Sequence, residues 1–168
     1  MARDGAPYVG FLYAGLMISP DGDPKVIEFN CRHGDPECEP IMVRLQSDLL
    51  AACQAALAGE LADFELTFDP RVALGVVMAA GGYPLSYESG DKITGLEKEL
   101  VDTQTFHAGT RLEGDDVVTA GGRVLCVVGL GSTVTNAQAR AYEQVDVIGW
   151  RNRYYRKDIG YRAIERET

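Results

Sequence analysis

Three polar residues spaced by two, Glu28, Asn30 and Arg32, form the first group with residue types that can do chemistry. They lie in the run Lys25–Arg32, which is typical of a strand. Side chains two apart on a strand point the same way, so the three share one face. A carboxylate and an amide oxygen suit Mg²⁺, and a guanidinium can neutralise charge on a moving phosphoryl group. The alternative is a solvent-facing strand edge with an incidental salt bridge. The opposite face carries the apolar set Ile27, Phe29 and Cys31.

An acidic loop follows at once, with the sequence Gly-Asp-Pro-Glu-Cys-Glu-Pro over residues 34–40. Two of its carboxylates, Asp35 and Glu37, can orient a substrate amine or support metal ligands. An acidic turn just before a helix also has a purely structural reason, because anions stabilise helix N-termini. The sequence leaves both interpretations open for these two residues.

The sequence context of His107 and of the cysteines favours structural roles for these residues. His107 has no serine or cysteine beside it in a nucleophile motif, so we expect a structural histidine. A zinc site built from Cys31, His33 and Cys38 would lack a standard spacing and a fourth ligand. We expect all four cysteines to be reduced core thiols: Cys31, Cys38, Cys53 and Cys126. We expect the aromatic residues near the C-terminus to pack the tail onto the domain rather than stack on a base: Trp150, Tyr154, Tyr155 and Tyr161.

Length and charge narrow the class of protein. The chain has 168 residues, enough for one ordinary domain or two small ones, and a net charge of −9. This acidic balance argues against nucleic acid or an anionic membrane surface as a partner. No apolar run is long enough to cross a bilayer, and residues 1–7 do not resemble a signal peptide. We therefore predict a cytoplasmic protein.

The pattern of apolar residues and turns predicts an α+β fold. Runs over 8–18 and 25–32, separated by Pro, Gly and Asp, predict a β-hairpin. Apolar residues every three to four positions predict a helix over 40–57 that ends at Gly59, and a second helix over 133–147. We place a soft boundary near 60–70. Further strands are expected at 72–80, 105–108, 117–119 and 123–129, the last two joined through residues 120–122.

Several collinear blocks resemble one enzyme family. The most specific is Arg-x-Gly-Asp-Pro-Glu, at the end of Lys25–Glu37, which is preceded by Tyr8–Met17. Together the blocks resemble the phosphoribosylamine–glycine ligases (glycinamide ribonucleotide synthetases), which are ATP-grasp enzymes of purine biosynthesis. One departure is His33, at a position that is usually phenylalanine in the family; we expect its ring to fill the aromatic position. The resemblance continues through Leu74–Pro84, Phe106–Thr110, Gly121–Cys126 and Arg156–Ile164.

The resemblance implies a fold and a reaction. Residues 1–65 would be the C-terminal portion of an ATP-grasp domain and residues 66–168 the small, mixed α/β C-terminal domain of the ligase. The reaction joins glycine to 5-phosphoribosylamine through glycyl phosphate, and ATP is hydrolysed to ADP and phosphate. Family members are more than twice this length, so we expect this part alone to be inactive without the missing N-terminal part. The alternatives are a non-catalytic subunit or interaction module that assembles with a separate N-terminal half, and a stand-alone acidic binding module.

The resemblance also implies a role for individual residues. Glu28 and Asn30 would bind the Mg²⁺ or Mn²⁺ ions that bridge the ATP phosphates, and Arg32 would steady the phosphate during transfer. The loop of the signature block would lie at the substrate end of the site, and a basic pair would face the 5′-phosphate of the substrate. The implied substrate-binding residues are Asp35, Glu37, Arg156 and Lys157.

Overall fold

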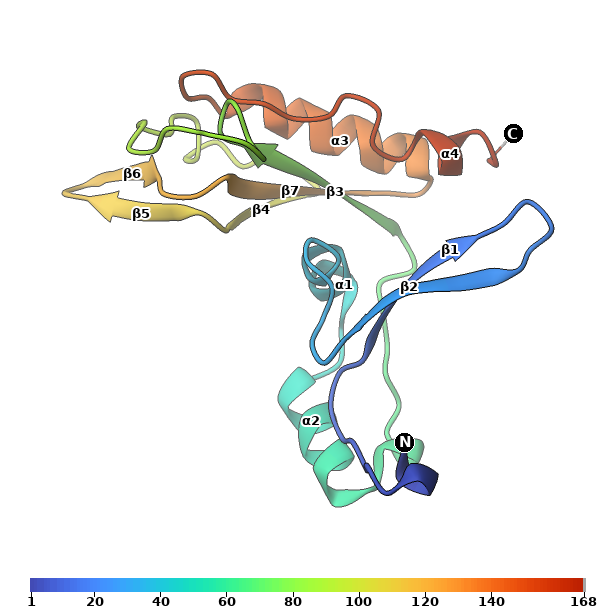
Figure 1. Cartoon of the computed structure of the whole chain (residues 1–168). Coiled ribbons are helices and arrows are strands. Elements are labelled where there is room, and N and C mark those ends of the chain that lie inside the picture. Colours follow the sequence, from blue (N-terminus) through green and yellow to red (C-terminus); the bar gives the residue numbers. More distant parts are fainter. Residues whose placement is uncertain (168) are drawn as a thin grey trace. The chain divides into compact units, whose positions relative to one another are not determined.

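The computed structural model describes residues 1–167, which form two compact units (Figure 1). The first unit comprises Met1–Cys38 and Leu45–Phe68, and the second comprises Glu39–Arg44 and the chain from Asp69 onward. The mixture of helices and antiparallel strands confirms the α+β class. Within residues 1–167 no helix is both long and apolar enough to span a membrane.

The first unit is built on an antiparallel hairpin of β1 (Tyr13–Ile18) and β2 (Pro24–Asn30), which follows a short 3₁₀ turn, η1 (Ala2–Asp4). The expected hairpin is therefore present, but β1 is shorter than the predicted 8–18. The reason is the register: Tyr13 pairs with Asn30, where β2 ends, so residues 8–12 have no strand opposite them. A bulge between Gly15 and Leu16 shifts the pairing further along the hairpin.

The predicted helix over 40–57 is two helices, α1 (Cys38–Arg44) and α2 (Leu49–Ala58). Residues 45–48 leave the helix because Leu45 bridges to Phe68 and the carboxylate of Asp48 caps α2. That carboxylate accepts hydrogen bonds from the amides of Leu50 and Ala51 at 2.8 and 3.1 Å. The predicted stop is confirmed, since Gly59 ends α2 with a φ of 78°. A second 3₁₀ turn, η2 (Leu61–Asp63), follows.

The second unit is a three-stranded antiparallel sheet covered by one long helix. The strands are β3 (Val72–Ala79), β4 (Thr103–His107) and β7 (Arg123–Gly131), in the order β3-β7-β4. Helix α3 (Val134–Val147) packs on β7 and β3 through a buried stripe of Ala137, Ala141 and Val145, the spacing expected of one helix face. Central β7 is buried over most of its length, so this layer is the core of the unit.

A separate two-stranded ribbon pairs β5 (Thr110–Glu113) with β6 (Asp116–Thr119). The sequence did not predict β5. The connection through residues 120–122 joins β6 to β7 in the chain, but β6 pairs with β5, whereas β7 pairs with β3 and β4. The chain ends in a short helix, α4 (Tyr161–Ile164).

An ion pair at the start of β3 makes the second unit sensitive to acid. Arg71 binds the carboxylates of Asp69 and Asp102, each at 2.7 Å. Hydrogen bonds from the side chain and backbone of Arg71 lower the pKa of Asp69 from 3.8 to about 2. A group whose pKa is lower in the folded state adds stability above its unfolded pKa and loses it as the pH falls through the folded value.

We therefore expect Asp69→Asn to lower the urea midpoint at pH 7, with the gap from the parent chain closing between pH 4 and pH 2. The measurement is urea unfolding followed by circular dichroism at several pH values. Asp115→Asn is the matched control, because Asp115 is exposed and makes no ion pair among the described residues. A gap that persists unchanged at pH 2 would contradict the expectation.

Candidate active site

Glu28 and Asn30 lie on one face of the hairpin. Directly opposite residues of an antiparallel pair share a face, and Glu28 pairs with Gly15 while Asn30 pairs with Tyr13. Gly15 leaves room for the glutamate, since a Cβ there would lie 3.2 Å from Glu28 Cγ. Glu28 is exposed and forms no ion pair among the described residues, so its carboxylate oxygens are available.

The side chain of Arg32 lies beside Asn30, as predicted, but strand alternation does not put it there. Strand β2 ends at Asn30, so Arg32 does not continue the alternation of the strand. Its guanidinium turns back and donates to Asn30 Oδ1 at 3.3 Å and to the carbonyl of His33 at 2.8 Å. Both partners are neutral, and no carboxylate among residues 1–167 pairs with Arg32. Its positive charge is therefore not compensated locally.

The acidic loop returns to the same face through Glu37. The phenol of Tyr13 donates a hydrogen bond to Glu37 Oε1 at 3.2 Å. Asp35 is exposed in the same loop, where a cis peptide bond joins it to Pro36. Tyr13 was not among the predicted site residues, and no local pattern points to it, because 24 residues separate it from Glu37.

His33 makes an aromatic contact. Its ring centroid lies 4.0 Å from that of Phe11. This is the packing expected of an imidazole that fills a phenylalanine position. Cys31, by contrast, was predicted to be a core thiol and is exposed, because the apolar face of this two-stranded sheet is not covered within the described structure.

The predicted phosphate-binding pair lies in the second unit. Arg156 forms a two-pronged ion pair with Asp158, with N···O distances of 2.9 and 2.8 Å, and Lys157 is exposed. The phenol of Tyr142 on α3 anchors this tail by donating to the carbonyl of Arg156 at 2.6 Å. Arg156 lines an open hollow of about 420 Å³ together with Arg162, a second cation that the sequence analysis did not single out.

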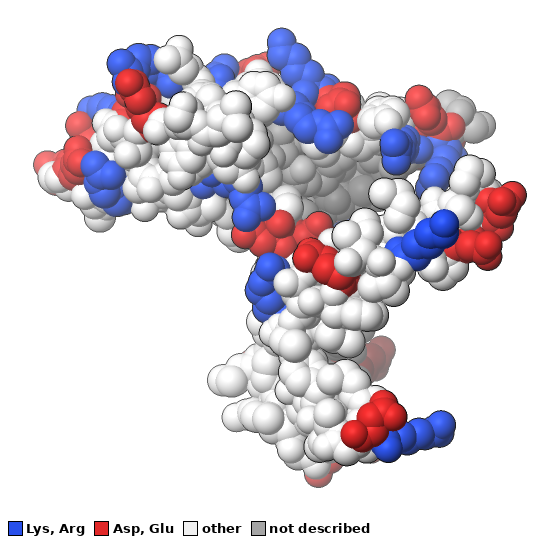
Figure 2. Space-filling view, viewed as in Figure 1, with Lys and Arg blue, Asp and Glu red and all other residues white. Residues whose placement is uncertain are grey.

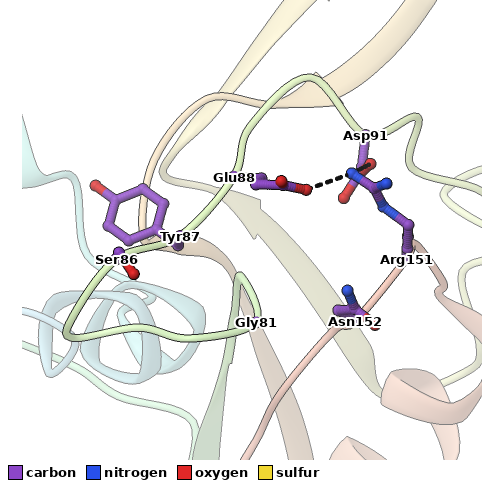
Figure 3. A pocket seen from close by; sticks show the side chains of 7 residues that line it. All are labelled: Gly81, Ser86, Tyr87, Glu88, Asp91, Arg151 and Asn152. Atoms are coloured by element: carbon purple, nitrogen blue, oxygen red, sulfur yellow. Dashed lines mark hydrogen bonds and ion pairs between the residues drawn. The ribbon is translucent and has the colours of Figure 1, made fainter.

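Another hollow in the second unit, of about 280 Å³, contains none of the predicted residues (Figure 3). Arg151 lies between Glu88, at 2.7 Å, and Asp91, at 3.2 Å. Figure 3 shows the Glu88 carboxylate directed at this guanidinium. The charged groups therefore satisfy one another, and we assign this hollow no role.

The other candidate residues have structural environments. His107 Nδ1 lies 3.0 Å from Thr110 Oγ1, as suits a structural histidine. Tyr155 packs against Tyr142, with ring centroids 6.1 Å apart, and Trp150 packs on the core, as predicted. The same prediction is wrong for Tyr154 and Tyr161, whose side chains are exposed. Among the described residues no group of three or more His, Cys, Asp or Glu side chains could hold a metal ion.

Comparison with known proteins decides the family. The model of the C domain of phosphoribosylglycinamide synthetase matches residues 73–162, and the model of its ATP-grasp (A) domain matches residues 1–38. The chain belongs to the phosphoribosylglycinamide synthetase family.

Individual relatives of the synthetase family agree. The phosphoribosylamine–glycine ligases of Vibrio cholerae and of Escherichia coli O6:H1 are each 59% identical to this chain over 99% of its length. The crystal structure of the ligase from Thermotoga maritima superposes with a TM-score of 0.79 at 38% identity and covers 94% of this chain. The chain spans 39% of the length of each of these three relatives.

The hairpin face of this synthetase-family chain fits part of a divalent metal site. Glu28 and Asn30 would contribute a carboxylate and an amide oxygen, the hard ligands that Mg²⁺ and Mn²⁺ take. The Nδ2 atom of Asn30 is buried and has no hydrogen-bond partner among the described residues, so only the Oδ1 atom of this amide is held, by Arg32. Two protein ligands are too few for tight binding, and nucleotide phosphates and water would have to complete the shell.

Proposed function

We propose that this chain supplies the C-terminal part of a phosphoribosylamine–glycine ligase. The reaction joins glycine to 5-phosphoribosylamine, with ATP converted to ADP and phosphate through glycyl phosphate, in purine biosynthesis. The observation that carries the proposal is the gathering of Glu28, Asn30, Arg32 and Glu37 around one face of the hairpin, in a chain of this family.

The chemistry has two steps. A carboxylate oxygen of glycine attacks the γ-phosphorus of ATP, which gives glycyl phosphate and releases ADP. The amine nitrogen of phosphoribosylamine then attacks the acyl carbon, phosphate leaves, and the nitrogen loses a proton. The first step needs positioning and charge neutralisation rather than a covalent side chain. The uncompensated guanidinium of Arg32 suits the transferring phosphate.

The other roles follow the same chemistry. Glu28 and Asn30 would hold Mg²⁺ or Mn²⁺, which when bound neutralises charge on the ATP phosphates. Asp35 and Glu37 would face the amine-bearing substrates. Arg156 and Lys157 would face the 5′-phosphate. We propose a cytoplasmic location for the protein. In this proposal residues 1–65 are the C-terminal portion of the ATP-grasp domain and residues 66–168 the C-terminal domain.

The surface of the first unit supports assembly with the part of the enzyme that precedes the matched region in the relatives. The hairpin exposes Ile27 by 65% and Phe29 by 60%, which leaves large apolar side chains in water. Helix α2 contains no charged residue, and Figure 2 shows its surface without charge. Its Leu57 is 78% exposed. Large exposed apolar side chains on these two elements favour an interaction site.

We expect the chain alone to release no ADP from ATP with glycine and phosphoribosylamine, because it carries only part of the site. Mixing it with the front part of the Vibrio cholerae relative, from its N-terminus to the start of the matched region, should restore turnover. The measurement is glycine-dependent ADP release, with each part assayed separately as the control. Turnover by this chain alone would refute the expected inactivity.

The same mixture tests the alternative of a non-catalytic subunit or interaction module, which the exposed apolar hairpin also favours. Size-exclusion chromatography would report the complex. A stable complex without glycine-dependent turnover would favour that alternative over the ligase.

A further inference from the structure

Tyr13 occupies a central position on the polar face of the hairpin. It is the first residue of β1 and lies directly opposite Asn30, which ends β2. Its side chain therefore lies on the same face as Asn30 and Glu28. Unlike these two, the half-buried Tyr13 also reaches out of the sheet, to the acidic loop.

The contact between Tyr13 and the loop is close and depends on a glycine. The phenol donates to Glu37 Oε1 at 3.2 Å. Gly34 is buried beneath both side chains: a Cβ at this position would collide with the carboxylate of Glu37 and lie 2.7 Å from Tyr13 Cε2. The loop then closes on itself, because the amide of Cys38 donates to the carbonyl of Gly34 at 3.1 Å. The aromatic ring and the loop thus define where the carboxylate lies.

The charges around the phenol keep it a hydrogen-bond donor. The negative charge of Glu37 is the largest cause that raises the pKa of Tyr13, followed by burial and the hydrogen bond to Glu37; Glu28 adds to it and Arg32 opposes it. The charges of Glu28, Arg32 and Glu37 therefore all affect the pKa of the Tyr13 phenol. It stays protonated at neutral pH and donates to the carboxylate rather than repelling it.

We propose that Tyr13 is a positioning residue that holds the Glu37 carboxylate on the metal-ligand face, where this carboxylate receives the amino group of a substrate. The inference rests on the function proposed above and adds a residue to it. Glu37 Oε1 accepts from the phenol, and Oε2, for which the described residues 1–167 provide no hydrogen-bond donor, can accept an N–H from the ligand. Glycine and phosphoribosylamine both carry an amino group, and the experiment below determines which of the two substrates binds Glu37.

The test is steady-state kinetics on Tyr13→Phe in the reconstituted assembly, with Tyr8→Phe as the matched control. The Tyr8→Phe variant also loses only a hydroxyl, whose partners are the carbonyl of Phe11 and the thiol of Cys31, both outside the loop of residues 34–40. We expect the KM of one amine substrate to rise about three- to tenfold, the effect of one hydrogen bond, with the KM of ATP unchanged. The substrate whose KM moves identifies the ligand of Glu37. Unchanged KM values for both amines would overturn the inference.

Hydrogen exchange on the chain alone gives a readout that is independent of turnover. Exchange of the Cys38 amide should accelerate several-fold in Tyr13→Phe and stay at the parent rate in Tyr8→Phe, since only the first variant releases the loop. Unchanged exchange in Tyr13→Phe would overturn the inference even if the assembly is active. If exchange is faster in Tyr13→Phe but the parent assembly does not turn over, the result would count against the proposed ligase, while the link between Tyr13 and the loop would stand.

Discussion

Glu28→Gln should lower glycine-dependent ADP release in the reconstituted assembly by about 100-fold or more. The substitution keeps the size of the side chain and removes the only charged oxygen ligand that β2 offers to a divalent cation. Loss of a single electrostatic contact to a transition state costs about 100- to 1,000-fold in turnover. Glu28 is exposed and unpaired among the described residues, so the fold should tolerate the change.

The assay should be run across a Mn²⁺ titration, because a lost ligand also shifts the metal concentration needed for half-maximal rate upward. Asp21→Asn is the matched control: it neutralises an exposed carboxylate in the turn of the same hairpin, away from the polar face. A Glu28→Gln variant with parental turnover and parental Mn²⁺ dependence would remove Glu28 from the proposed site.

The polar face of the hairpin was predictable because it depends on a local rule. Alternation along a strand places Glu28 and Asn30 together whatever the rest of the chain does, and the register confirms this for both. Arg32 joined them although the strand had already ended, through a hydrogen bond that alternation does not describe. The prediction was right about the grouping of Arg32 and wrong about its cause.

Features that depend on distant residues were not predictable. The periodic apolar pattern gave one helix over 40–57, but a bridge from Leu45 to Phe68 and a cap at Asp48 divide it. The Asp48 cap is a local feature, and the Ser-Asp pair at 47–48 was a visible capping signal that the apolar periodicity masked. Tyr13, like the bridge from Leu45 to Phe68, was missed because its partner Glu37 lies beyond the range of any local pattern.

Exposure of apolar side chains has a different origin. Ile27, Phe29 and Cys31 were assigned to one apolar face, and Cys31 was predicted to be buried there as a core thiol, although β2 ends before it, at Asn30. They are exposed because burial depends on what covers a face, which alternation alone does not reveal. In our proposal, the part of the enzyme that precedes this chain in the relatives provides the cover.

The core of the second unit depends on a close approach between β7 and α3, and Gly129 sits at this contact. A Cβ on Gly129 would collide with the carbonyl oxygen of Ala137 and lie 2.5 Å from the amide nitrogen of Ala141. Both atoms belong to helix backbone, which cannot move aside as a flexible side chain can. Ala137 and Ala141 of α3 face the strand at this point and are themselves fully buried.

We therefore expect Gly129→Ala to destabilise the chain by about 2–3 kcal/mol, at the upper end of the usual cost of overpacking, because helix and strand must separate to admit one methyl group. The measurement is the urea midpoint and slope at pH 7. Gly149→Ala is the matched control, since a Cβ there would lie 3.4 Å from Thr94 Oγ1, an ordinary contact distance. Equal midpoints for the two variants would mean that α3 can shift on the sheet without cost, and the packing of β7 against α3 would no longer explain the stability of this unit.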